Sequence, residues 1–160
     1  MTRQQDQIGK HGQSIAASVL SGMGVNMVEH IGTPVKLVPH FHGSFMVPNV
    51  YTVIFGEKVS GDHRGVLDNG ISVLAETKTI MDRNLRWSDL REHQPDRLIE
   101  HAKYGGLSLL VWVHSSGVYV MIFPIEGFGA GKRFTIEQAR QEHKKTSITL
   151  DKILKKKDGL

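Results

Sequence analysis

The chain has 160 residues, which suits one domain or one domain with an appendage, and 39% of them are hydrophobic, as in an ordinary globular fold. Twenty Lys and Arg against 16 Asp and Glu give a formal charge of +4, which favours a polyanionic partner without proving one. The lack of cysteine excludes disulfides, cysteine-ligated zinc, iron–sulfur clusters and thiol nucleophiles. No apolar run approaches the roughly 20 residues of a membrane span, and the N-terminus is polar, so we expect a cytoplasmic protein without membrane contact.

The first third of the chain predicts one helix followed by extended segments. Residues 9–22 carry apolar side chains at helical spacing, and two glycines then end the helix. Residues 25–31 and 34–38 are β-like, with a bend or bulge between them. Residues 39–50 hold two prolines, a glycine and apolar side chains that do not resemble ordinary core. We interpret them as part of a protruding hairpin.

The rest of the chain alternates predicted strands and helices. In chain order we expect a strand over 51–55, a hairpin of 65–67 with 71–78, an irregular charged stretch over 80–92, a helix from Pro95 to Gly105, strands over 107–113 and 118–123, and a short polar helix over 135–145. Asp68–Asn69–Gly70 is a strong tight-turn signal within the hairpin. Since neither repeats nor a low-complexity linker occur, we predict one α/β domain over 1–145 and a basic C-terminal tail over 146–160.

The clearest chemical pattern lies around the predicted hairpin. Asp62 stands at the mouth of a turn, fourteen residues before Glu76, and the hairpin folds this interval back on itself. Both carboxylates can therefore converge at one end of the sheet. Glu76 and Lys78 are two residues apart on a strand and point to the same face. A mostly apolar strand thus ends in two charges, where a structural strand normally ends in turn residues.

Two carboxylates and an ammonium group suit metal-dependent hydrolysis of phosphodiesters. Carboxylate oxygens bind Mg²⁺, which polarises phosphate, lowers the pKa of a bound water and balances developing charge. We expect Asp62 and Glu76 as metal ligands with the backbone carbonyl of Thr77 as a third, and we expect Mn²⁺ to substitute. Lys78 would orient the attacking water or stabilise the transition state. The structural alternative is a surface salt bridge at a strand end, because this spacing also arises by chance.

The order of these residues resembles a known class of nucleases. Gly61–Asp62 followed by Glu76-x-Lys78 is similar to the PD-(D/E)xK signature of restriction-endonuclease-like enzymes, with glycine in place of the usual proline. Over residues 9–124 the chain more specifically resembles the RecU-type Holliday junction resolvases. The motifs that support this resemblance are Gly9-Lys10, Val28-x-x-Ile31-x-Thr33-Pro34-Val35-Lys36, Asp62-x-x-Gly65-Val66, Glu76-x-Lys78-Thr79 and His93-Gln94.

The resemblance implies a fold, a reaction and an assembly. The fold is α/β and restriction-endonuclease-like, a mixed β-sheet flanked by helices, with a protruding β stalk inserted at about 36–58. The reaction is hydrolysis of DNA four-way junctions that leaves 5′-phosphate ends, and a homodimer follows because the junction is two-fold related and needs two symmetric incisions. In that family the first helix commonly offers a glutamate to the active site. The corresponding position here is Gln13, whose amide can position water or phosphate but is a poor Mg²⁺ ligand.

Contacts with DNA are expected beside the site and along the stalk. Stalk aromatics could lie against exposed bases at the junction centre, unless residues 39–50 instead contribute ordinary core. The expected DNA-binding residues are Lys10, Lys36, Phe41, Phe45, Lys58 and Arg64.

Several interpretations stay open at this point. His93–Gln94 lies either beside the metal site or simply at a helix cap. The scattered histidines match no zinc-site spacing and are expected on the surface: His40, His42, His63 and His101. Two other functions compete with junction resolution, namely a restriction- or repair-type nuclease of the same fold and a non-catalytic DNA-binding module. Comparing four-way junction with linear duplex, and cleavage with binding, would separate the three.

Overall fold

The computed structural model describes residues 3–31, 35–42, 45–55 and 61–155, with side chains for 7–31 and 61–155. Among these residues no helix is long and apolar enough to cross a membrane. The elements in chain order are α1 (Arg3–Gly22), β1 (Val25–His30), β2 (Val35–His42), β3 (Phe45–Phe55), β4 (His63–Leu67), β5 (Ser72–Thr79), β6 (Leu85–Arg86), the 3₁₀ turn η1 (Trp87–Asp89), α2 (His93–Lys103), β7 (Leu107–His114), β8 (Gly117–Ile122), β9 (Arg133–Phe134) and α3 (Ile136–Lys155).

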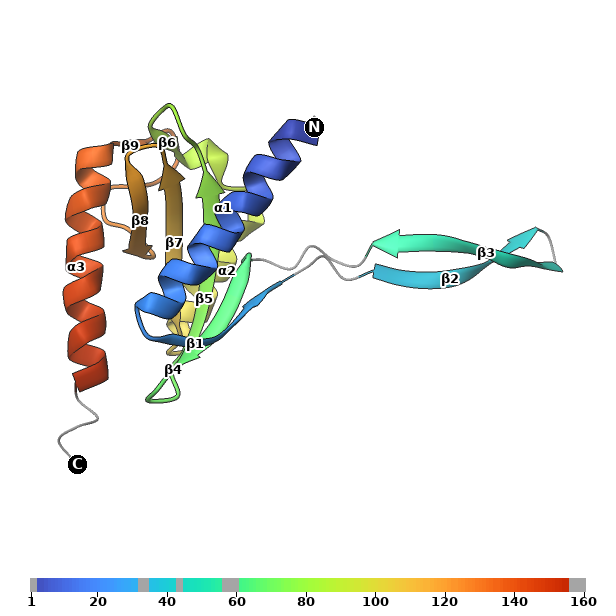
Figure 1. Ribbon diagram of the computed structural model, residues 1–160, viewed down its shortest axis with the longest axis horizontal. Coiled ribbons are helices and arrows are strands. Elements are labelled where there is room, and N and C mark those ends of the chain that lie inside the picture. The colour runs from blue at the N-terminus through green and yellow to red at the C-terminus, as the bar shows by residue number, and fades with distance from the viewer. Residues whose placement is uncertain (1–2, 32–34, 43–44, 56–60, 156–160) are drawn as a thin grey trace.

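Five strands form the central sheet in the order β1-β4-β5-β7-β8. β5 and β7 run parallel, and the other neighbours are antiparallel. Parallel strands need a crossover connection, which α2 supplies between β5 and β7. Residues 107–113 of β7 are all buried, as their apolar run predicts for a central strand. A mixed sheet flanked by helices confirms the predicted fold class (Figure 1).

Hydrophobic clusters lie on both faces of this sheet. On β5, Val73 and Ala75 pack in one cluster with Ala16 of α1. Leu74, which lies between them in sequence, packs against the other cluster with Leu98 of α2. Because side chains alternate along a strand, even-numbered residues of β5 face α2 and odd-numbered residues face α1. This alternation decides where the charged end of β5 points.

Strands β2 and β3 form a two-stranded antiparallel sheet of their own. Pairing runs from Val35↔Phe55 to His42↔Phe45, with an irregularity after Pro39. A proline cannot donate to a strand ladder, so it belongs at such an interruption. In Figure 1 this hairpin extends away from the helices and the central sheet.

The C-terminal helix is longer than the sequence predicts. We expected a helix over 135–145 and a basic tail over 146–160, but α3 continues to Lys155. Thr146 and Leu150 are each only 2% exposed. The Thr146 hydroxyl accepts the backbone N–H of Ile122 at 3.0 Å, so α3 covers the edge strand β8. The lysines of this stretch lie mostly on the exposed side of the helix and mask its apolar spacing. Residues 156–160 lie outside the described part.

The charged stretch 80–92 also contains regular structure that we did not predict. β6 pairs with β9 in an antiparallel sheet, with Leu85 opposite Phe134. Both of these side chains are buried in the cluster on the α2 side of the central sheet. Since the two strands are more than forty residues apart in sequence, no local pattern indicates their pairing.

Candidate active site

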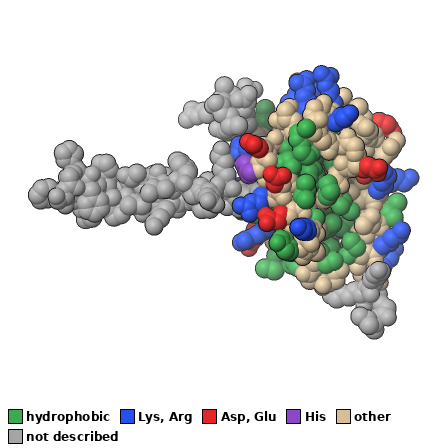
Figure 2. Space-filling model, turned by 180° about the vertical axis from the view of Figure 1, so that it is seen from behind, with side chains coloured by type: hydrophobic (Ala, Val, Ile, Leu, Met, Phe, Trp, Pro, Cys, Tyr) green, Lys and Arg blue, Asp and Glu red, His purple; other side chains and the backbone are tan. Residues whose placement is uncertain are grey.

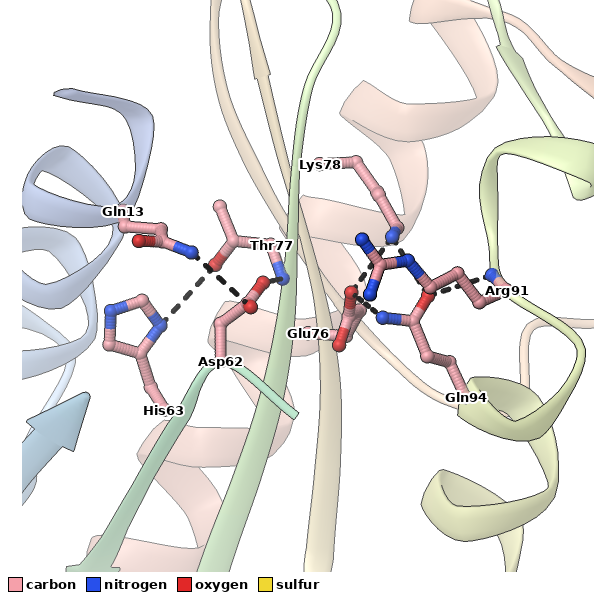
Figure 3. Close-up of polar contacts among 8 residues, drawn as sticks. All are labelled: Gln13, Asp62, His63, Glu76, Thr77, Lys78, Arg91 and Gln94. Atoms are coloured by element: carbon pink, nitrogen blue, oxygen red, sulfur yellow. Dashed lines mark hydrogen bonds and ion pairs between the residues drawn. The ribbon is translucent and has the colours of Figure 1, made fainter. Parts of the chain in front are cut away.

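Asp62 is held at the start of β4 by four hydrogen bonds. Its backbone N–H donates to the carbonyl of Ala75 at 2.8 Å, and its own carbonyl accepts the N–H of Ile31 at 2.8 Å. Of its carboxylate oxygens, Oδ2 accepts the backbone N–H of Thr77 at 2.8 Å and Oδ1 accepts the side-chain amide of Gln13 at 3.3 Å. The carboxylate is therefore anchored beside the backbone of β5 and oriented by α1 (Figure 3).

The residue before Asp62 must be glycine in this backbone. Gly61 has φ +87°, a left-handed conformation that L side chains rarely adopt. A Cβ placed there would lie 2.6 Å from Leu74 Cδ1. The ring of proline fixes φ near −65°, so the proline of the usual signature could not take this conformation. The departure from that signature is thus a requirement of the local turn.

Glu76, Lys78 and Gln94 form a polar cluster on the α2 side of β5 (Figure 3). Glu76 is 1% exposed and Gln94 is 7% exposed. Lys78 Nζ lies 2.8 Å from Glu76 Oε1 and donates to Gln94 Oε1 at 2.8 Å. The amide nitrogen of Gln94 donates to the same Glu76 oxygen, and its Oε1 also accepts the backbone N–H of Arg91 at 2.8 Å. Gln94 therefore both binds the backbone of the turn before α2 and holds the two charged residues of β5.

The second carboxylate oxygen of Glu76 is buried and has no hydrogen-bond partner among the described residues. Burial raises the pKa of the Glu76 carboxyl; Lys78 opposes this rise, and the charge of Asp62 adds to it. A buried, unpartnered carboxylate oxygen is costly unless a positive charge compensates it. Asp62 and Glu76 flank the backbone of Thr77 with hard oxygen donors, so the residues fit a Mg²⁺ ion. In the described ranges no group of three or more His, Cys, Asp or Glu suits a metal, so backbone or amide oxygens would complete such a set.

His63 lies on the α1 side of the site, next to Asp62. We expected this histidine on the surface, but it is 2% exposed. Its Nδ1 lies 3.4 Å from the Thr77 hydroxyl, and its ring meets His30 edge-on with centroids 5.7 Å apart. Burial lowers the pKa of His63, so the ring is mostly neutral at pH 7. The prediction was wrong because alternation along β4 turns His63 inward and its neighbour Arg64 outward.

The sequence left the role of one further polar residue of the site open, Gln94, and did not indicate another, Arg91. The pair His93–Gln94 was left open between a place beside the metal site and a helix cap, and Gln94 lies beside the candidate site, in contact with Glu76 and Lys78. Arg91 carries no sequence signal, yet its guanidinium points toward Glu76 and Lys78 (Figure 3), and its charge, like that of Lys78, opposes the rise that burial causes in the pKa of Glu76.

The predicted DNA-binding residues are spread over the molecule. Lys10 is exposed on α1, and Arg64 is exposed on β4 but pairs with Glu29 at 3.0 Å. Lys36, Phe41 and Phe45 lie on the β2–β3 hairpin, with side chains outside the described part, as is the whole of Lys58. A groove of about 670 Å³ opens beside the site; its lining includes Gln13, Thr77, Lys78, Arg83 and Asp89.

Comparison with known proteins gives support at the level of the fold. No family model and no curated protein matches the chain. Among solved structures the chain is similar to Hjc of Archaeoglobus fulgidus, a Holliday junction resolvase from an archaeal hyperthermophile, with a TM-score of 0.52 and 14% identity over 87% of this chain and 99% of that one. It is also similar to SSO0001, with a TM-score of 0.40 and 18% identity over 89% of this chain and 59% of that one. The likeness to Hjc shows that the chain shares the fold of that protein, a mixed sheet flanked by helices.

Proposed function

We propose that the protein is a structure-selective DNA endonuclease of the RecU type that resolves four-way junctions by metal-dependent hydrolysis of phosphodiesters. One observation supports this above all: Asp62 and the Glu76–Lys78 pair flank the backbone of a single strand, and the buried Glu76 carboxylate keeps one oxygen without a donor among the described residues. The fold shared with an archaeal Holliday junction resolvase supports the same proposal.

Each side chain of the site would have a different role in the reaction. Asp62, Glu76 and the Thr77 carbonyl would hold Mg²⁺, which when bound polarises the phosphate and lowers the pKa of a water. Gln94 fixes the side chains of Glu76 and Lys78 against each other before substrate arrives. Lys78 then presents a positioned ammonium group beside the groove, where it orients the attacking water or balances charge that develops on the phosphate.

Selectivity for four-way junctions would come from the β2–β3 hairpin. This hairpin extends from the body of the molecule and offers the shape that an open junction centre accommodates (Figure 1). Phe41 and Phe45 lie at its distal end in the strand register, where aromatic rings could stack on exposed bases. A homodimer would supply the two active sites that paired, symmetric incisions require.

The direct test incubates the chain with a labelled four-way junction and with linear duplex of the same sequence, each in Mg²⁺. We expect paired nicks at symmetric positions of the junction with 5′-phosphate ends, and little cut duplex. Equal cleavage of both substrates would instead indicate a general nuclease of this fold. Junction binding without any cleavage would indicate a DNA-binding module.

A further inference from the structure

A group of positive charges lies on the small β6–β9 sheet, apart from the residues of the candidate active site. Arg86 and Arg133 are directly opposite each other in this sheet. Their neighbours Leu85 and Phe134, also a pair, are buried in the core. Because adjacent residues of a strand point to opposite faces, both arginines stand on the outer face of the sheet, where both are exposed.

These arginines border a small hollow in the surface. It has a volume of about 170 Å³ and is lined by Arg86, Trp87, Ser88, Gly131, Lys132 and Arg133. The backbone N–H of Trp87 donates to the carbonyl of Lys132 at 3.1 Å, which ties the two sides of the hollow together. The Trp87 ring stacks on Phe123 with centroids 6.2 Å apart and so belongs to the packed core. Three cations and a hydroxyl thus surround a hollow with a fixed frame.

The charges of the hollow are poorly compensated within the described part of the chain. None of Arg86, Lys132 and Arg133 takes part in an ion pair there. Asp89 is close enough for the charge of Arg86 to act on it, but its carboxylate already binds the Arg83 guanidinium through two bonds of 2.9 and 2.8 Å. Like charges directly opposite on paired strands destabilise a sheet. An anion between the arginines would remove this repulsion.

The hollow lies at the same end of the molecule as the candidate active site. Arg86 stands eight residues after Lys78 and eight before Gln94, so its segment leaves the site and returns to it. The groove beside Lys78 continues to Arg83 and Asp89, and Asp89 accepts the backbone N–H of Arg86 at 2.7 Å. Figure 1 places β6 and β9 beyond the tip of β5, and Figure 2 shows Lys and Arg side chains at that end as well as along the flanks of the molecule.

We propose that the hollow formed by Arg86, Lys132 and Arg133 binds a backbone phosphate of the DNA, as a second anchoring point outside the catalytic centre. The proposal rests on the proposed function, because it takes DNA as the substrate. Guanidinium groups bind phosphate oxygens in a bidentate manner, and phosphate contacts fix the register of a duplex without reading its sequence. The hollow therefore sets how the substrate lies across the site, and it contributes affinity for any DNA arm.

The test compares two variants of the full chain that lose the same charge. One carries Arg86→Gln, Lys132→Gln and Arg133→Gln; the control carries Lys144→Gln, Lys152→Gln and Lys155→Gln on the exposed side of α3. Affinity for four-way junction and for linear duplex is measured over a range of salt in EDTA, so that no cleavage intervenes. The slope of log affinity against log salt should become shallower by about 0.9 in the hollow variant, the change expected for one phosphate that the protein no longer neutralises, and change little in the control.

Three results would overturn the proposal. An unchanged slope in the hollow variant, or an equal change in both variants, would overturn the proposal, as would a wild-type chain that binds no DNA. Thermal melting checks the fold, and Arg86→Lys with Arg133→Lys, which keeps the charges, should retain most of the salt dependence. A wild-type chain that binds DNA but cleaves none would contradict the proposed function alone, because the binding comparison would still decide the role of the hollow.

Discussion

Asp62 and Glu76 lie on two sides of strand β5, and the surroundings of their carboxylates differ (Figure 3). Asp62 is half-buried, and each of its oxygens accepts a hydrogen bond, one from the Thr77 backbone and one from Gln13. Glu76 is fully buried, and Lys78 and Gln94 both bind one of its oxygens while the other has no partner in the described part. Hydrogen bonds thus preorganise the first carboxylate, whereas burial leaves the second short of positive charge.

The largest expected effect comes from removing either carboxylate charge. Asp62→Asn and Glu76→Gln should each abolish junction cleavage, a loss of at least about 10²-fold, because each removes a metal ligand whose effect on the barrier is several kcal/mol. Junction binding should persist, since the substitution also reduces repulsion of the phosphates. Cleavage and binding are measured on the same labelled junction. Either variant cutting at the wild-type rate in ordinary Mg²⁺ would remove that residue from the site.

Substitution of Gln94 tests whether cleavage depends on the Gln94 amide that holds the side chains of Glu76 and Lys78. Gln94→Ala removes the group that holds both Glu76 and Lys78, and we expect cleavage to fall about 10- to 100-fold, as for other residues that position metal ligands. His93→Ala is the matched control, one position earlier in the same helix. If the two variants cut equally fast, the contacts of Gln94 have no part in the reaction.

Substitution of Gln13 tests the Asp62 side of β5, where we expect a smaller effect and a gain in Mg²⁺ binding instead of a loss of cleavage. Gln13→Glu would place a third carboxylate beside Asp62, at the distance where the amide now donates. A third hard oxygen ligand strengthens divalent cation binding, so cleavage should reach half its maximum at a several-fold lower Mg²⁺ concentration. Gln13→Ala should shift this concentration little, because the Thr77 N–H still holds Asp62. An unchanged or higher Mg²⁺ requirement in Gln13→Glu would show that Gln13 lies outside the metal site.

The smallest effect is on stability and concerns the pH dependence that the Glu76 carboxyl contributes. The pKa of Glu76 is raised in the folded chain, so the folded state binds the proton more tightly than the unfolded state does. Without divalent cations, the free energy of unfolding should therefore decrease as pH rises from about 4.5 through the folded pKa of Glu76. Glu76→Gln should lack this decrease. Denaturant unfolding of both proteins at several pH values measures it, and parallel pH profiles would contradict the raised pKa.

The sequence predicted those parts of the site that depend on local structure. Asp62, Glu76 and Lys78 are linked by one hairpin, so turn chemistry and strand alternation suffice to bring them to the same part of β5. Gln94 reaches the site through the α2 crossover, and its role could not be decided from spacing alone. His63 was misread because a lone histidine shows no sign of burial until its strand has partners on both sides.

Local patterns also failed to predict parts of the fold. The α1 helix begins at Arg3 rather than at residue 9, because its polar first turns lack the apolar repeat that was used to define it. The pairing of β6 with β9 joins segments far apart in the chain, and the basic hollow between Arg86 and Arg133 exists only through that pairing. Long-range strand pairing is thus the part of this fold that local patterns do not predict.

The most direct test of the central claim is a calorimetric titration of the chain with Mn²⁺, as a stand-in for Mg²⁺, using wild type, Asp62→Asn and Glu76→Gln. If the two carboxylates share one cation, the wild type binds Mn²⁺ and each substitution removes or strongly weakens that binding. The same cation should raise the melting temperature of the wild type far more than that of either variant, because it binds the folded state. A wild-type chain that binds no Mn²⁺, or a Glu76→Gln variant that binds it as tightly, would contradict the account.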